Sequence, residues 1–127
     1  MGLGAWVAVG AGAAMGAWLR WGLGLMLNST FPILPLGTLA ANLIGGYVMG
    51  LVMGLFAVTT SVSPEMRLFA TTGFLGGLTT FSAFSAEAVT LMMRAQYGWA
   101  ISHVLVHVIG SLAMTALGIM TIQIIKN

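Results

Sequence analysis

The chain has 127 residues, of which 59% are hydrophobic and only 5% are charged, and its formal net charge is +2. A water-soluble domain carries roughly 25% charged residues, so this composition excludes a fold whose whole surface faces water. The length allows several membrane spans of about 20 residues each, with short connections and no large extra domain. Cysteine is absent, which excludes disulfides and thiolate metal sites.

Four apolar stretches, separated by polar or proline-marked breaks, predict four transmembrane helices. The first stretch begins close to the N-terminus and lacks the positively charged region of a signal peptide, so it is interpreted as a span. Tyr97 and Trp99 precede the last stretch and suit the headgroup interface. The sequence therefore predicts an all-α membrane protein with a single domain over residues 1–127 and helices at about 3–27, 36–58, 65–93 and 99–125.

The charged residues give no clear orientation. In a four-helix topology Arg67 and Lys126 lie on one side of the membrane, and Arg20 and Arg94 lie toward the other. The bias that normally fixes orientation is missing, which predicts insertion in both directions and an antiparallel, dual-topology homodimer. The alternative is that four positive charges are too few to indicate any orientation.

Glycines recur at four-residue intervals on three of the predicted helices. Such stripes let helix backbones approach closely. The spacing does not distinguish packing within one chain, which is the default interpretation, from packing between two chains. The stripes are Gly12 and Gly16, then Gly46, Gly50 and Gly54, then Gly73 and Gly77.

The third stretch is interrupted at its centre by the segment GFLGGLTTFSAFS, residues 73–85. Gly76 and Gly77 tolerate unusual dihedral angles, and the hydroxyls of Thr79 and Thr80 can satisfy backbone groups freed from the helix. Non-helical backbone at membrane depth survives only when it is buried in protein or lines a wet cavity. The sequence therefore predicts a broken third helix at GGLTT whose free carbonyls suit a hard cation.

Polar side chains on the other helices lie in register. Thr38 and Asn42 are four residues apart, and a ladder at the same spacing follows on the last helix: His103, His107, Ser111 and Thr115. Each step rises about 6 Å, so the ladder predicts a polar permeation track, with interhelical hydrogen bonding as the alternative. The two histidines could also bind a metal, but the sequence places no carboxylate or thiolate beside them.

Phe81 and Phe84 share one predicted helix face, and Ser82 and Ser85 share the neighbouring one. Phenylalanine edges carry positive quadrupole character, so two edges turned toward a pore would favour an anion. Simple packing is the alternative. Glu87 is unexpected beside an anion route; it either orients donors or pairs with Arg94.

The segment 73–85, the segment GTLAANLIGG at 37–46 and Arg20 within GAWLRW together resemble the Fluc (CrcB) fluoride channels of bacteria over essentially the whole chain. The resemblance implies passive, fluoride-selective export through two antiparallel pathways of a homodimer in the bacterial inner membrane. It implies pore roles for Asn42, Phe81 and Phe84. It also implies a structural sodium ion held by the backbone carbonyls of Gly76 and Thr79 of both chains.

The remaining side chains expected along the fluoride pathway are hydroxyl and imidazole donors: Thr38, Ser82, Ser85, His107, Ser111 and Thr115. Neutral donors spread along a track bind an anion weakly enough to release it. Arg20 resembles a vestibule arginine that raises the local anion concentration; a snorkelling anchor is the alternative.

Other classes of protein fit less well. A small dual-topology, proton-coupled exporter of cations would need a membrane carboxylate, typically in its first helix, where this chain has only Arg20. A holin-like or scaffolding protein would not need the polar ladder or the broken helix. The sequence shows no nucleophilic side chain paired with a general base, so it does not predict an enzyme. We expect the partners to be fluoride, lipid and a second copy of the chain rather than nucleic acid.

Overall fold

The computed structural model describes residues 2–127, and within that range the chain contains helices and loops but no strand. The first two long helices are α1 (Leu3–Leu27) and α2 (Leu36–Val58), and the last is α6 (Tyr97–Lys126). The third stretch is divided into α3 (Pro64–Leu68), the π-helix η1 (Phe69–Leu75), α4 (Gly76–Leu78) and α5 (Ser82–Met93). The predicted all-helical fold with a broken third helix is confirmed.

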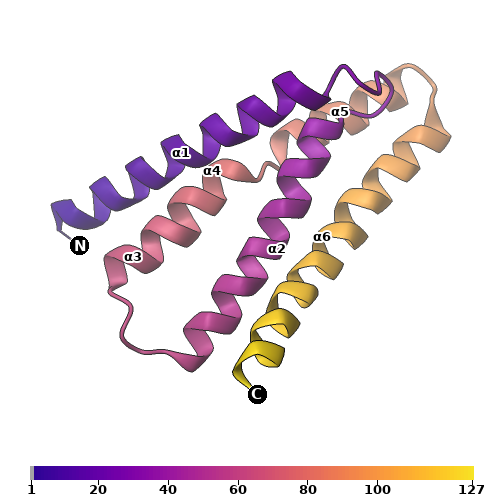
Figure 1. Ribbon diagram of the computed structural model, residues 1–127. Coiled ribbons are helices and arrows are strands. Elements are labelled where there is room, and N and C mark those ends of the chain that lie inside the picture. Colours follow the sequence, from indigo (N-terminus) through magenta and orange to yellow (C-terminus); the bar gives the residue numbers. More distant parts are fainter. Residues whose placement is uncertain (1) are drawn as a thin grey trace.

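The four segments alternate in direction: α1 and the segment from α3 to α5 run one way, and α2 and α6 run the other way (Figure 1). α2 packs along α6, while α1 packs against η1 and α4. The loop between α1 and α2 is fixed by Asn28, whose side-chain Oδ1 accepts hydrogen bonds from the backbone N–H groups of Gly37 at 2.7 Å and Thr38 at 3.3 Å. This cap satisfies donors at the start of α2, and it holds Thr38 at that end of the bundle.

The glycine stripes serve packing within the chain. A methyl group added to Gly50 would overlap the backbone of α6 at Thr115, and one added to Gly118 would overlap the backbone of α2 at Tyr47. Gly12 of α1 and Gly73 of η1 face each other in the same way. The close approach of these backbones therefore explains the stripes on α1, α2 and η1 without a second chain.

The break lies later than the glycines that were expected to form it. Gly76 and Gly77 are helical, and the chain leaves the helix at Thr79, whose ψ of 155° is extended. The break thus lies within GGLTT, as predicted, but at its threonines, and it does not use the conformational freedom of the two glycines. Gly77 is instead required for packing, because a side chain there would overlap the backbone of Ala13 on α1.

The outer surface of the bundle is apolar. Large side chains such as Leu112 and Ile124 on α6 and Trp18 on α1 are more than half exposed, and contiguous apolar surface of this kind marks contact with lipid or protein. Among the described helices, α2 and α6 are long and apolar enough to cross a membrane. A small core of Ala41, Leu75 and Leu78 joins α2 to the third segment.

Candidate functional site

The break in the third segment is held by a single side chain from α2. The Oδ1 atom of Asn42 accepts a hydrogen bond from the backbone N–H of Thr80 at 2.8 Å, and its Nδ2 atom donates to the backbone carbonyl of Thr80 at 3.1 Å. These two bonds satisfy polar backbone groups that the helix no longer pairs, which is a requirement at membrane depth. Asn42 therefore both stabilises the break and is oriented by it.

The same amide reaches the last helix. Asn42 Nδ2 lies 3.0 Å from Nδ1 of His107. Because the amide oxygen is already engaged by the Thr80 N–H, the amide nitrogen is the atom that faces the imidazole. His107 Nδ1 then accepts the hydrogen bond, and the neutral ring carries its proton on Nε2.

An aromatic layer covers these polar groups. The ring of Phe84 stacks on His103 with centroids 5.3 Å apart and contacts His107 at 4.8 Å. Phe84 is buried, whereas Phe81 is 79% exposed although the two phenylalanine rings are only 5.7 Å apart. Phe81 is the N-cap residue of α5 and has helical dihedral angles, and its carbonyl accepts a 2.8 Å hydrogen bond from the N–H of Ser85, so the two rings lie side by side at the start of α5 with only one of them buried.

A groove of about 510 Å³ lies between α2, the broken segment and α6. It brings together eight of the predicted residues: Asn42, Gly76, Thr79, Phe81, Phe84, His107, Ser111 and Thr115. Thr71 and Thr80 also line it. The sequence patterns had suggested no role for Thr71, which faces the groove from the unexpected π-helix.

The other predicted residues lie elsewhere. Thr38 and Arg20 line a second cavity of about 350 Å³ together with Glu87, and Arg20 Nε donates to the carbonyl of Gly77 at 3.1 Å. Arg20 therefore caps a carbonyl beside the break, a role that neither sequence interpretation included. Ser82 and Ser85 line neither of these two cavities.

The polar ladder of α6 is partly used for packing. The Thr115 hydroxyl lies within hydrogen-bonding distance of two carbonyls, that of Gly46 on α2 at 3.0 Å and that of Ser111 at 2.9 Å. Its single proton is therefore committed to backbone in the isolated chain, as the packing alternative predicted. Ser111 lines the groove without a side-chain hydrogen bond in the described residues.

The carbonyls of Gly76 and Thr79 have lost their helical donors. Gly76 would normally accept from the N–H of Thr80, which bonds to Asn42 instead, and Thr79 would accept from the N–H of Ala83, which bonds to the Thr80 hydroxyl at 3.1 Å. Residues 2–127 supply no other backbone N–H to either oxygen. Both carbonyls fit the oxygen chemistry that a hard monovalent cation requires.

The structure corrects the interpretation of the histidines. Glu87 Oε1 lies 3.3 Å from Nε2 of His103, so a carboxylate does stand beside the imidazoles. Spacing could not show this, because Glu87 is on α5 and the histidines are on α6. Glu87 also accepts a 2.7 Å hydrogen bond from the Thr38 hydroxyl, which agrees with the alternative in which it orients donors.

Comparisons with known proteins agree on one family. Residues 7–119 match the family model described as CrcB-like protein, Camphor Resistance (CrcB). The chain is 61% identical over 123 residues to a Nitrosospira multiformis protein named fluoride-specific ion channel FluC, covering 97% of this chain and 96% of that protein. Proteins with the same name from Cupriavidus pinatubonensis and Pseudomonas putida are 57% and 54% identical, each covering at least 94% of both chains. The chain belongs to the CrcB-like family, as its motifs had indicated.

Proposed function

We propose that this protein is a fluoride channel of the bacterial inner membrane that exports fluoride passively. The observation that carries the proposal is the groove in which Asn42, Phe84 and His107 converge. It is supported by the name, fluoride-specific ion channel, of relatives that are 54–61% identical to this chain over nearly its whole length.

The chemistry of the groove suits a small, strongly hydrated anion. The hydroxyl of Ser111 is a neutral donor that no side-chain hydrogen bond in the described residues engages, and the edge of Phe84 adds positive quadrupole character. Neutral donors replace water without trapping the ion, as a fixed cation would. Arg20 lies outside this groove, in the second cavity, where its charge favours the entry of anions.

The pathway is completed by a second, antiparallel copy of the chain. Phe81 is largely exposed in the single chain although it lies beside Phe84, so a partner that covers it would close the open side of the groove. The four basic side chains are divided two and two between the sides of a four-helix topology, which supports insertion in both orientations.

A structural sodium ion is part of the proposal. The carbonyls of Gly76 and Thr79 would hold it together with the same pair from the partner, because both oxygens lack a backbone donor within the chain. The ion supplies a fixed positive charge that links the two chains.

Efflux from proteoliposomes that contain only this chain tests the proposal. We expect fluoride to leave down its own gradient at a rate that does not depend on an imposed proton gradient. A proton-coupled cation exporter would instead move cations in exchange for protons and leave fluoride inside. A scaffolding protein would move neither.

A further inference from the structure

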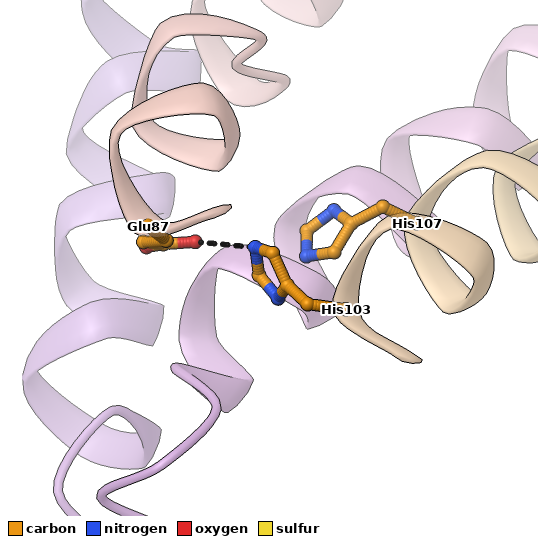
Figure 2. Close-up of side chains that lie close together, drawn as sticks. All are labelled: Glu87, His103 and His107. Atoms are coloured by element: carbon orange, nitrogen blue, oxygen red, sulfur yellow. Dashed lines mark ion pairs between the residues drawn. The ribbon is translucent and has the colours of Figure 1, made fainter. Parts of the chain in front are cut away.

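Three potential metal ligands from two helices converge behind Phe84. Glu87 extends from α5, and His103 and His107 extend from α6 toward it (Figure 2). One ligand atom from each side chain lies within 4.8 Å of the others. The two histidines are only 1% and 4% exposed, so their positions are set by packing within the chain.

These side chains carry buried polar atoms that have no hydrogen-bond partner. Among the described residues, the buried side-chain atoms without a hydrogen bond are Glu87 Oε1, His103 Nε2 and His107 Nε2. The first two are 3.3 Å apart, close enough for an ion pair but not aligned as a hydrogen bond. Unsatisfied buried polar atoms are rare, and their occurrence in one cluster indicates a ligand.

We propose that Glu87, His103 and His107 bind a divalent transition-metal ion such as Zn²⁺, and that this binding inhibits the channel. Two imidazoles and one carboxylate are a common zinc ligand set, with water in the fourth position. Hard cations such as Mg²⁺ and Ca²⁺ prefer several oxygen ligands, and the cluster supplies one carboxylate. The inhibitory part of this inference rests on the proposed fluoride channel.

Inhibition follows from the hydrogen bond between His107 and Asn42. With Asn42 Nδ2 donating to His107 Nδ1 at 3.0 Å, the neutral ring carries its proton on Nε2. Metal binding through Nε2 requires the other tautomer, in which an Nδ1 proton would face the amide protons of Asn42. The metal therefore breaks this hydrogen bond and displaces groups of the fluoride groove.

The surroundings of the cluster limit its affinity. A cation can approach Glu87 through the second cavity, which Arg20 and Thr38 also line. The positive charge of Arg20 opposes that approach, and the Thr38 hydroxyl already occupies Oε2 of the carboxylate. We therefore expect micromolar rather than nanomolar zinc binding.

The composition of the chain makes the test unusually clean. The chain contains two histidines, two acidic residues and no cysteine. Glu65, the other acidic residue, is exposed on α3. Glu87→Gln and Glu65→Gln are therefore the same chemical change at the only two carboxylate side chains, one inside the cluster and one outside it.

The experiment measures zinc binding by equilibrium dialysis and zinc inhibition of fluoride efflux, with tag-free protein reconstituted in liposomes. Each variant is compared with its own rate in the absence of zinc. We expect one zinc per chain in the wild type, and dissociation and half-inhibition constants raised at least about tenfold in Glu87→Gln and His103→Gln. Glu65→Gln should match the wild type, and Mg²⁺ should not inhibit.

Two outcomes would overturn the inference. One is a wild-type chain that binds no zinc at concentrations of tens of micromolar, and the other is equal zinc affinity in Glu87→Gln and Glu65→Gln. Dialysis does not depend on flux, so it decides the metal site even if the wild-type chain conducts no fluoride. Stoichiometric zinc binding without inhibition would contradict the proposed coupling to Asn42.

Discussion

Asn42 and Thr80 are joined by two hydrogen bonds, one in each direction between the amide side chain and the peptide backbone. Through this pair, α2 holds open the break in the third segment. The bond to the Thr80 N–H also deprives the Gly76 carbonyl of its helical donor. One asparagine thus determines the local backbone, the orientation of its own amide and the availability of a carbonyl oxygen.

Replacing Asn42 should therefore damage stability as well as flux. Asn42→Ala leaves the N–H and carbonyl of Thr80 unpaired, at a cost of about 1–3 kcal/mol for each group. We expect a lower midpoint of thermal unfolding in detergent and loss of fluoride efflux. Thr80→Ser, which retains both backbone bonds, should unfold close to the wild-type temperature. An Asn42→Ala protein as stable as wild type would show that the paired bonds contribute little.

The two phenylalanines should respond differently to the same substitution. Phe84→Ile removes aromatic contacts with both histidines, each worth about 0.5–1.5 kcal/mol, and should lower both stability and fluoride efflux. Phe81 is 79% exposed, so Phe81→Ile should leave the single chain intact and still reduce efflux sharply. Thermal unfolding and electrode-monitored efflux of both variants give the comparison. Wild-type efflux in both would mean that the rings only pack.

The sequence predicted helix positions well because length, hydropathy and proline breaks are local signals. Residues 3–27 and 36–58 were predicted as helices and are α1 and α2. The contact of Glu87 with His103 and the two hydrogen bonds between Asn42 and Thr80 were not predictable, because each connects residues of different segments that are far apart in the sequence. The π-helix η1 and the short helix α4 both pack against α1, and contacts between distant segments of this kind leave no local signal in the sequence.

Orientation in the membrane can be tested with added charge. Two or three lysines placed after Asn127 should bias all chains toward one orientation, since positive residues favour the cytoplasmic side. If the functional unit is antiparallel, fluoride resistance of cells should fall and should return when an oppositely biased copy is co-expressed. Full resistance from the biased chain alone would exclude a dual-topology requirement.

Gly76 provides a test of the sodium proposal that is separate from folding. A methyl group at this position meets only the Thr71 carbonyl, at 3.7 Å, so the single chain accommodates Gly76→Ala. If a partner chain or a shared ion lies against Gly76, the added methyl group should cause loss of the dimer and of bound sodium. Native mass spectrometry measures the dimer, and elemental analysis measures the sodium. Thr79→Val should retain sodium, because the proposed ligand is its backbone carbonyl.

The matched control is Gly98→Ala, where an added methyl group has no neighbour within 4 Å. It should leave the dimer, the sodium content and the efflux rate unchanged. A Gly76→Ala protein that behaves in the same way as this control would argue against a shared site at the break.

The central claim is that the groove between α2, the broken segment and α6 conducts fluoride selectively. In the most direct measurement, liposomes that contain only this chain are loaded with equal concentrations of fluoride and chloride. Ion-selective electrodes then follow both anions after an ionophore has removed the membrane potential that opposes their efflux. The account predicts rapid release of fluoride while chloride is retained. Retention of both anions, or release of both at the same rate, would contradict it.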